Sequence, residues 1–75
     1  MSKLSIEYEN GITVLVAGPS LDLKFKEDIN AFLEEQNKTT SPILLDVEKT
    51  NMVYSFGVAA VQNLCDIAEE NGRKF

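Results

Sequence analysis

The side chain best placed for chemistry is the hydroxyl of Ser55, which follows a short apolar segment and precedes a helical pattern. Gly57 lies two residues further on, and the apolar residues after it recur with helical spacing. The first backbone N–H groups of a helix have no partner within the helix, and the macrodipole is positive at that end. A phosphate on Ser55 would meet favourable electrostatics there, and a serine at this position also fits a plain helix cap.

Other kinds of chemistry have little support in the composition. The chain has no histidine and one cysteine, so histidine-based catalysis and a structural zinc site are close to excluded. The carboxylate pairs Glu34-Glu35 and Glu69-Glu70 fit solvated helix faces, because nothing in the sequence buries one member of either pair. The glycines are isolated and form no phosphate cradle. We therefore expect no enzyme, no metal and no cofactor.

Length and charge restrict the remaining classes of protein. The 75 residues form one small domain, residues 1–75, whose 44% apolar content is typical of a globule. Seven Lys and Arg residues against twelve Asp and Glu residues supply no basic face, so we expect no nucleic-acid partner. No apolar run approaches the ~20 residues of a membrane span. A single cysteine fits a reducing compartment, and we predict a cytoplasmic protein without membrane insertion.

The first half of the chain predicts a hairpin and a helix. Residues 4–9 alternate as in a strand with one wet face, Asn10-Gly11 favours a tight turn, and residues 12–17 should form the inner strand. Asp22 can cap the helix that follows. The side chains that this helix should bury are Phe25, Ile29, Phe32 and Leu33.

The second half, after a polar break over residues 37–42, predicts a strand and a second helix. Residues 43–47 are apolar on both faces, which favours an interior strand parallel to residues 12–17. The helix should run from about Ser55 to Glu70, with Asn71-Gly72 as its left-handed C-cap. Its predicted buried stripe is Val58, Val61, Cys65 and Ala68. The predicted fold class is α/β: a β-hairpin, then α-β-α, with both helices on one face of a mixed sheet.

These elements resemble the STAS domain, a family named for sulfate transporters and anti-sigma factor antagonists, over nearly the whole chain. The run Leu45-Asp46-Val47 resembles the family's strand end, and Gly18-Pro19-Ser20-Leu21-Asp22 resembles its glycine-x-leucine-aspartate element. Residues 53–59, VYSFGVA, resemble the family's aspartate-serine-serine-glycine-leucine-glycine motif at a helix start. Tyr54 stands in place of the aspartate and Phe56 in place of the second serine.

The resemblance implies a bacterial regulator of the anti-sigma factor antagonist type that acts by protein–protein binding. It implies that Ser55 is the phosphoacceptor, that an anti-sigma factor serine kinase is the partner, and that a serine phosphatase reverses the modification. The predicted partner-binding residues are Asp22, Tyr54, Ser55, Phe56, Gly57 and Val58. The alternative is a non-phosphorylated STAS scaffold subunit of a transport or signalling assembly, in which Ser55 would be buried or would only cap the helix.

Two further expectations concern exposed apolar groups. Met52, Tyr54 and Phe56 cluster beside Ser55, and we expect Tyr54 to be a docking residue and Phe56 to pack under the helix start. Family members usually continue after the position of Phe75 with another strand and helix. Strand 43–47 would then have an open side, and we expect self-association in which a second copy fills the place of the missing strand. The alternative is that residues 73–75 pair locally and leave a monomer.

Overall fold

The predicted hairpin is present in the computed structural model, which describes residues 4–35 and 40–75. β1 (Ser5–Glu9) and β2 (Ile12–Val16) pair antiparallel. Asn10 and Gly11 have φ of 51° and 79°, and two successive positive values are what a type I′ turn requires. β1 differs from the prediction, because all five of its residues are exposed instead of one face being buried. β1 is an edge strand of its sheet and pairs only with β2.

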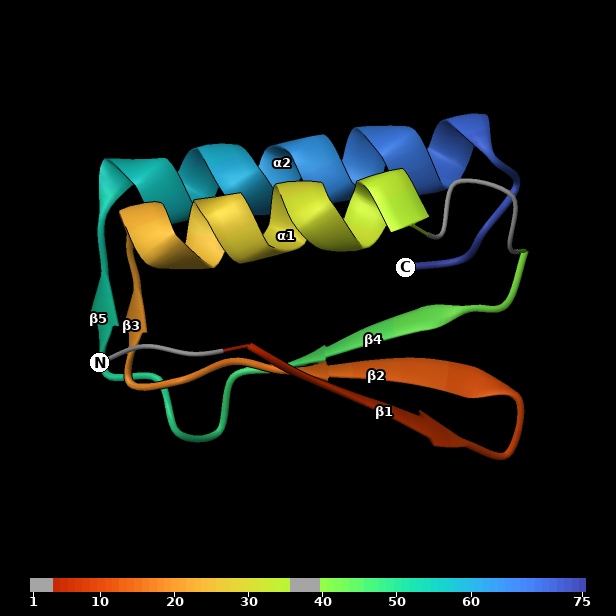
Figure 1. Cartoon of the computed structure of the whole chain (residues 1–75), viewed down its shortest axis with the longest axis horizontal. Coiled ribbons are helices and arrows are strands. Elements are labelled where there is room, and N and C mark those ends of the chain that lie inside the picture. The colour runs from red at the N-terminus through yellow and green to blue at the C-terminus, as the bar shows by residue number, and fades with distance from the viewer. Residues whose placement is uncertain (1–3, 36–39) are drawn as a thin grey trace.

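The α/β fold class is confirmed by the arrangement of the longer elements. β4 (Ile43–Asp46) pairs parallel with β2, and the sheet order is β1-β2-β4. α1 (Leu23–Glu35) and α2 (Ser55–Glu70) both lie on one face of this sheet (Figure 1). The polar break predicted over residues 37–42 falls partly on residues 36–39, which lie outside the described residues.

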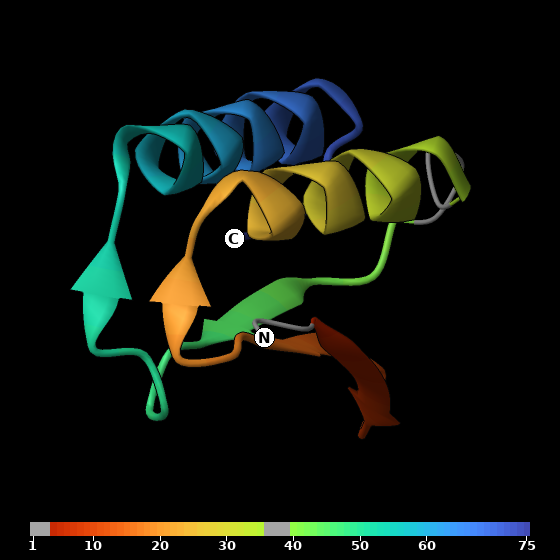
Figure 2. The same ribbon diagram turned by 60° about the vertical axis from the view of Figure 1, so that its left-hand side comes forward.

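A second, two-stranded sheet was not predicted from the sequence. β3 (Ser20–Leu21) and β5 (Met52–Val53) pair parallel, and each leads directly into a helix (Figure 2). The hydroxyl of Thr50 donates to the carbonyl of Gly18 at 2.8 Å, and the N–H of Asn51 donates to the carbonyl of Pro19 at 2.9 Å. These bonds align the two chain segments just before the strands begin.

The core lies between the helices and the larger sheet. The predicted buried face is confirmed for α1 but not for α2. The four predicted side chains of α1, Phe25, Ile29, Phe32 and Leu33, are buried. The buried face of α2 is Gly57, Ala60, Leu64 and Ala68. The predicted stripe is therefore wrong at three positions: Val58 is 60% exposed, and Val61 and Cys65 are half-buried. Three of these four buried residues, Gly57, Ala60 and Ala68, have a small side chain or none, which allows α2 to pack closely on its neighbours.

The end of α2 is held by the predicted left-handed cap. Gly72 has φ of 71°, its N–H donates to the carbonyl of Glu69, and the N–H of Arg73 donates to the carbonyl of Ala68 at 2.8 Å. This pair of bonds is a Schellman motif. It turns the chain sharply, so that Arg73 points back under the helix layer.

The side chain of Arg73 links the C-terminal segment to the sheet through hydrogen bonds. Its side chain is buried, and its Nε donates to the carbonyl of Ser41 at 2.7 Å. Its Nη2 lies 3.3 Å from the hydroxyl of Thr13 and 3.2 Å from that of Ser41, and the guanidinium lies over the ring of Phe32. Burial lowers the pKa of Arg73, and the charge of Tyr8 acts in the opposite direction. The guanidinium stays charged at neutral pH, because its usual pKa lies far above 7.

Replacing this guanidinium should cost a substantial part of the stability of a domain this small. We expect Arg73→Ala to lower the free energy of unfolding by about 2 kcal/mol, because charge-assisted bonds to Ser41 and Thr13 are lost. Urea unfolding followed by circular dichroism measures the change. Lys74→Ala is the matched control, since that neighbouring side chain is exposed and its loss should change little. Equal effects of the two substitutions would contradict the role given to Arg73.

β4 lies at an edge of the three-stranded sheet in the described part of the chain, where an interior strand was predicted. The N–H of Ile43 donates to the carbonyl of Lys74 at 2.8 Å, so the last residues pair locally with the start of β4. Leu44 and Val47 are 55% and 45% exposed. Self-association through the rest of this edge stays a prediction. Sedimentation equilibrium at micromolar concentrations tests it, and a monomeric mass with unfolding independent of concentration would exclude it.

Candidate functional site

The starts of both helices lie at one end of the molecule because β3 and β5 are parallel neighbours. Leu21 pairs with Val53, and the N–H of Tyr54 donates to the carbonyl of Leu21 at 3.0 Å. The next residues of the two chain segments, Asp22 and Tyr54, therefore both leave this short sheet at the end where the helices begin, and Ser55 follows Tyr54 (Figure 2). The carboxyl ends of adjacent parallel strands are a common place for functional groups.

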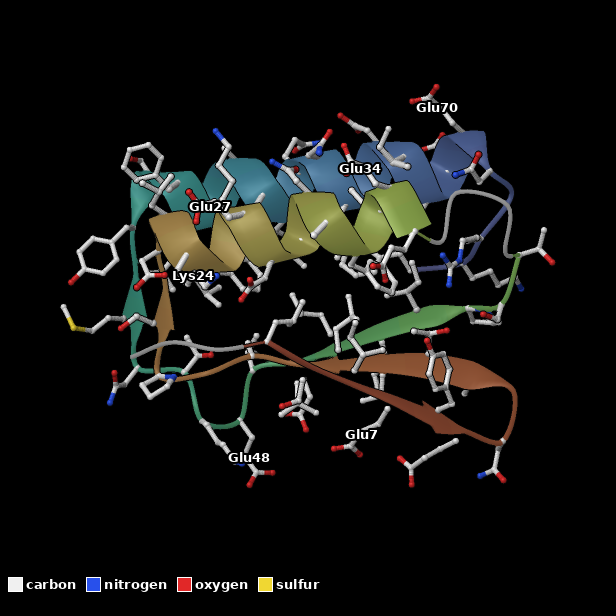
Figure 3. The ribbon with its side chains drawn as sticks, in the orientation of Figure 1. Glu7, Lys24, Glu27, Glu34, Glu48 and Glu70 are labelled. Carbon is white, nitrogen blue, oxygen red and sulfur yellow. The ribbon has the colours of Figure 1, made fainter. Side chains whose placement is uncertain are left out.

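Asp22 caps α1, as predicted. Its Oδ1 accepts a hydrogen bond from the N–H of Phe25 at 3.1 Å. The next turn carries an ion pair between Lys24 and Asp28 at 3.3 Å, and the side chain of Lys24 is partly exposed at this end of the molecule (Figure 3). The carboxylate of Asp22 therefore has a structural role, whatever part it takes in binding.

Ser55 is the first residue of α2 and does not cap it. The N-cap position belongs to Tyr54, which has extended backbone geometry and makes no side-chain cap hydrogen bond. The carbonyl of Tyr54 accepts the N–H groups of Gly57 and Val58 at 2.9 and 3.1 Å. Ser55 is exposed, and its hydroxyl has no hydrogen bond to another described residue. Of the two roles that the sequence left open for Ser55, the helix cap is therefore excluded, and the side chain is accessible from solvent.

Gly57 has a structural role that its place in the motif did not reveal. It is buried, and a Cβ at this position would overlap the carbonyl oxygen of Leu21 and lie 2.5 Å from the Cβ of Leu21. Only a residue without a side chain allows α2 to start this close to β3. Gly57 is thus buried against β3, and its place among the predicted partner-binding residues stays a prediction.

The residues around Ser55 form an apolar surface, which we call the α2-start surface. Tyr54 is 45% exposed, as expected for a docking residue. Phe56 is 48% exposed, so the prediction that it packs under the helix is wrong, because Gly57 takes the buried position. The Nζ of Lys26 lies 5.8 Å from the centre of the Phe56 ring. The exposed apolar members of this surface are Met52, Val53, Tyr54, Phe56 and Val58.

An apolar groove continues from this surface along α2. It has a volume of about 390 Å³ and lies between α2, β5 and the C-terminal residue. Cys65, which was expected in the core, is half-buried here. Gln62 is the one polar residue among those that line the groove, which are Leu21, Val53, Gly57, Val58, Val61, Gln62, Cys65 and Phe75. The predicted apolar stripe of α2 is thus real, but most of it faces this groove and not the core.

Comparisons with known proteins do not assign this chain to a family. A scan against models of known protein families found no match, and a search of curated proteins found none either. Among the described residues, no group of three or more His, Cys, Asp or Glu side chains is placed to hold a metal ion. The described helices include none long and apolar enough to cross a membrane.

The close approach at Gly57 can be tested by adding a methyl group. We expect Gly57→Ala to lower the free energy of unfolding by about 1–3 kcal/mol, because backbone overlap outweighs the better helix propensity of alanine. Thermal or urea unfolding measures the change. Ala59→Gly, in the same helical turn at an exposed position, is the control and should cost roughly 1 kcal/mol or less. A stabilising Gly57→Ala would show that α2 is not held by this contact.

Proposed function

We propose that this protein is a regulatory binding domain of the anti-sigma factor antagonist type, which binds a protein partner through the α2-start surface and is switched by phosphorylation of Ser55. The proposal rests on one observation. Ser55 is exposed, its hydroxyl does not cap α2, and it lies within a continuous apolar surface. The resemblance of residues 18–22, 45–47 and 53–59 to STAS motifs supports the same reading.

The apolar side chains of this surface favour protein binding. Exposed aromatic residues and methionine are enriched at protein interfaces, and Tyr54, Phe56 and Met52 are all about half exposed. The hydroxyl of Tyr54 lies 3.7 Å from the sulfur of Met52, so these two side chains form one cluster. The first turn of α2 has no acidic residue. A partner can therefore bury this surface without also burying a carboxylate of α2.

Phosphorylation of Ser55 would place a negative charge within this apolar surface. In the transfer, the oxygen of Ser55 bonds to the γ-phosphorus of ATP, the bond from that phosphorus to ADP breaks, and the hydroxyl proton leaves. The product carries roughly −1.5 to −2 charge at neutral pH. The uncapped N–H groups of α2 can stabilise a phosphate in the free protein. A partner that covers the apolar surface would have to desolvate the phosphate, which weakens binding.

The expected partner is a serine kinase of the anti-sigma factor type, and a serine phosphatase would restore the binding form by hydrolysis. The corresponding compartment is the bacterial cytoplasm. The alternative, a STAS scaffold subunit, requires Ser55 to be buried or to cap the helix. The exposed, non-capping hydroxyl favours the switch over the scaffold.

Substitutions at Ser55 test the proposal. Ser55→Ala should keep partner binding and abolish phosphorylation, while Ser55→Asp should weaken binding by about tenfold or more, since a charge is placed in an apolar interface. Calorimetry with the partner kinase and mass spectrometry of the phosphorylated protein provide the measurements. Ser5→Ala is the control, because it removes an exposed hydroxyl of β1, outside the α2-start surface. Phosphate incorporation at the normal rate in Ser55→Ala would exclude Ser55 as the acceptor.

A further inference from the structure

The apolar groove beside α2 is a second binding feature, and its charges indicate what it binds. We infer that it takes a short amphipathic helix of a partner protein, with basic residues at the end that lies beside the C-terminal half of α2. The inference rests on the proposed function, because the groove shares Val53 and Val58 with the α2-start surface.

The geometry of the groove favours a helix as its occupant. Val58, Val61 and Cys65 follow one another at intervals of three and four residues, which forms a ridge against which a second helix can pack. Peptide helices commonly bind in such grooves through apolar residues of one face. No residue of β4 lines the groove, so it is not the open strand edge. From Val58 to Glu69 the axis of α2 rises by about 16 Å, which corresponds to roughly three turns of a docked helix.

The charged residues of α2 are all negative, whereas the exposed Lys74 directly precedes the lining residue Phe75. Glu69 continues the face of Val58, Gln62 and Cys65, and Gln62 donates a hydrogen bond to Asp66 at 3.0 Å. This bond holds a carboxylate beside a residue that lines the groove. α2 contains no Lys or Arg, and its last turn has no cation to offset the helix dipole. A basic residue of the partner would neutralise both the carboxylates and the dipole.

Other occupants of the groove would be repelled. A second copy would bring the same net charge of −5 and the same carboxylates. Nucleic acids and anionic membrane surfaces are also negative. The acidic character extends around the molecule: Glu34 and Glu70 project from the helix layer, and Glu7 and Glu48 from the opposite side of the sheet (Figure 3). Charge complementarity therefore selects a basic protein segment.

The experiment uses Cys65 as the reporter, because it is the single cysteine of the chain and lines the groove. The probe is a synthetic amphipathic peptide of about 14 residues, with leucines on one face and lysines towards one end. Its binding should slow the alkylation of Cys65 by iodoacetamide by about tenfold at saturation, since a docked helix excludes the reagent. The control peptide carries glutamate at every lysine position and should not protect Cys65.

Two double variants with the same change in net charge show whether the carboxylates of α2 matter. Asp66→Lys with Glu69→Lys should weaken binding of the basic peptide by about tenfold or more at low salt. Glu34→Lys with Glu35→Lys, on α1, should weaken it much less. Self-association of the free protein through the edge of β4 should leave Cys65 reactive, because no residue of β4 lines the groove. An unprotected Cys65, equal losses in both double variants, or a dimer whose Cys65 is already protected would each overturn the inference.

Ser55→Asp separates this inference from the proposed function. If that variant binds its partner kinase as well as the wild type while the peptide still protects Cys65, the phosphorylation switch is wrong and the groove inference stands. If Ser55→Asp weakens kinase binding but the peptide never protects Cys65, the groove inference is wrong and the switch stands.

Discussion

The close contact between Gly57 and Leu21 is the constraint on which the arrangement of this site depends. Because α2 starts against the backbone of β3, the first turn of α2 has no room for a side chain at position 57. The flanking residues Phe56 and Val58 are consequently directed outward and are about half exposed or more. One packing requirement thus both anchors α2 and produces the apolar surface around Ser55.

Local signals predicted the parts of the fold that local interactions determine. Asn10-Gly11 predicted the hairpin because its turn needs two residues that tolerate positive φ, and Gly72 predicted the end of α2 for the same reason. The cap at Asp22 follows from its own carboxylate and a backbone N–H three residues away. Each of these features is fixed by a few neighbouring residues, so no knowledge of the tertiary structure was needed.

The predictions from the sequence failed where tertiary contacts determine which of several local structures forms. α2 has two apolar stripes, and the sequence pattern favoured the one with larger side chains. The structure instead buries Gly57, Ala60, Leu64 and Ala68, and a side chain at position 57 would overlap Leu21 of β3. The β3–β5 pair could not be predicted either, since two-residue strands have no periodicity and depend on bonds between distant segments, such as Tyr54 to Leu21. Ser55 was correctly located at the helix start, but the sequence could not decide between a capping and a non-capping hydroxyl, and the structure shows the second.

The proposed switch and the proposed groove partner act at opposite ends of α2, which makes them compatible. Ser55 and Glu69 are 14 residues apart in one helix, so their backbones are separated by about 21 Å. This exceeds the Debye length of about 8 Å at physiological salt. A phosphate on Ser55 would therefore act on the apolar end of a bound partner and would add little attraction for basic residues near Glu69. Its effect on binding would be set by local desolvation, which is unfavourable, and not by the overall charge of the partner.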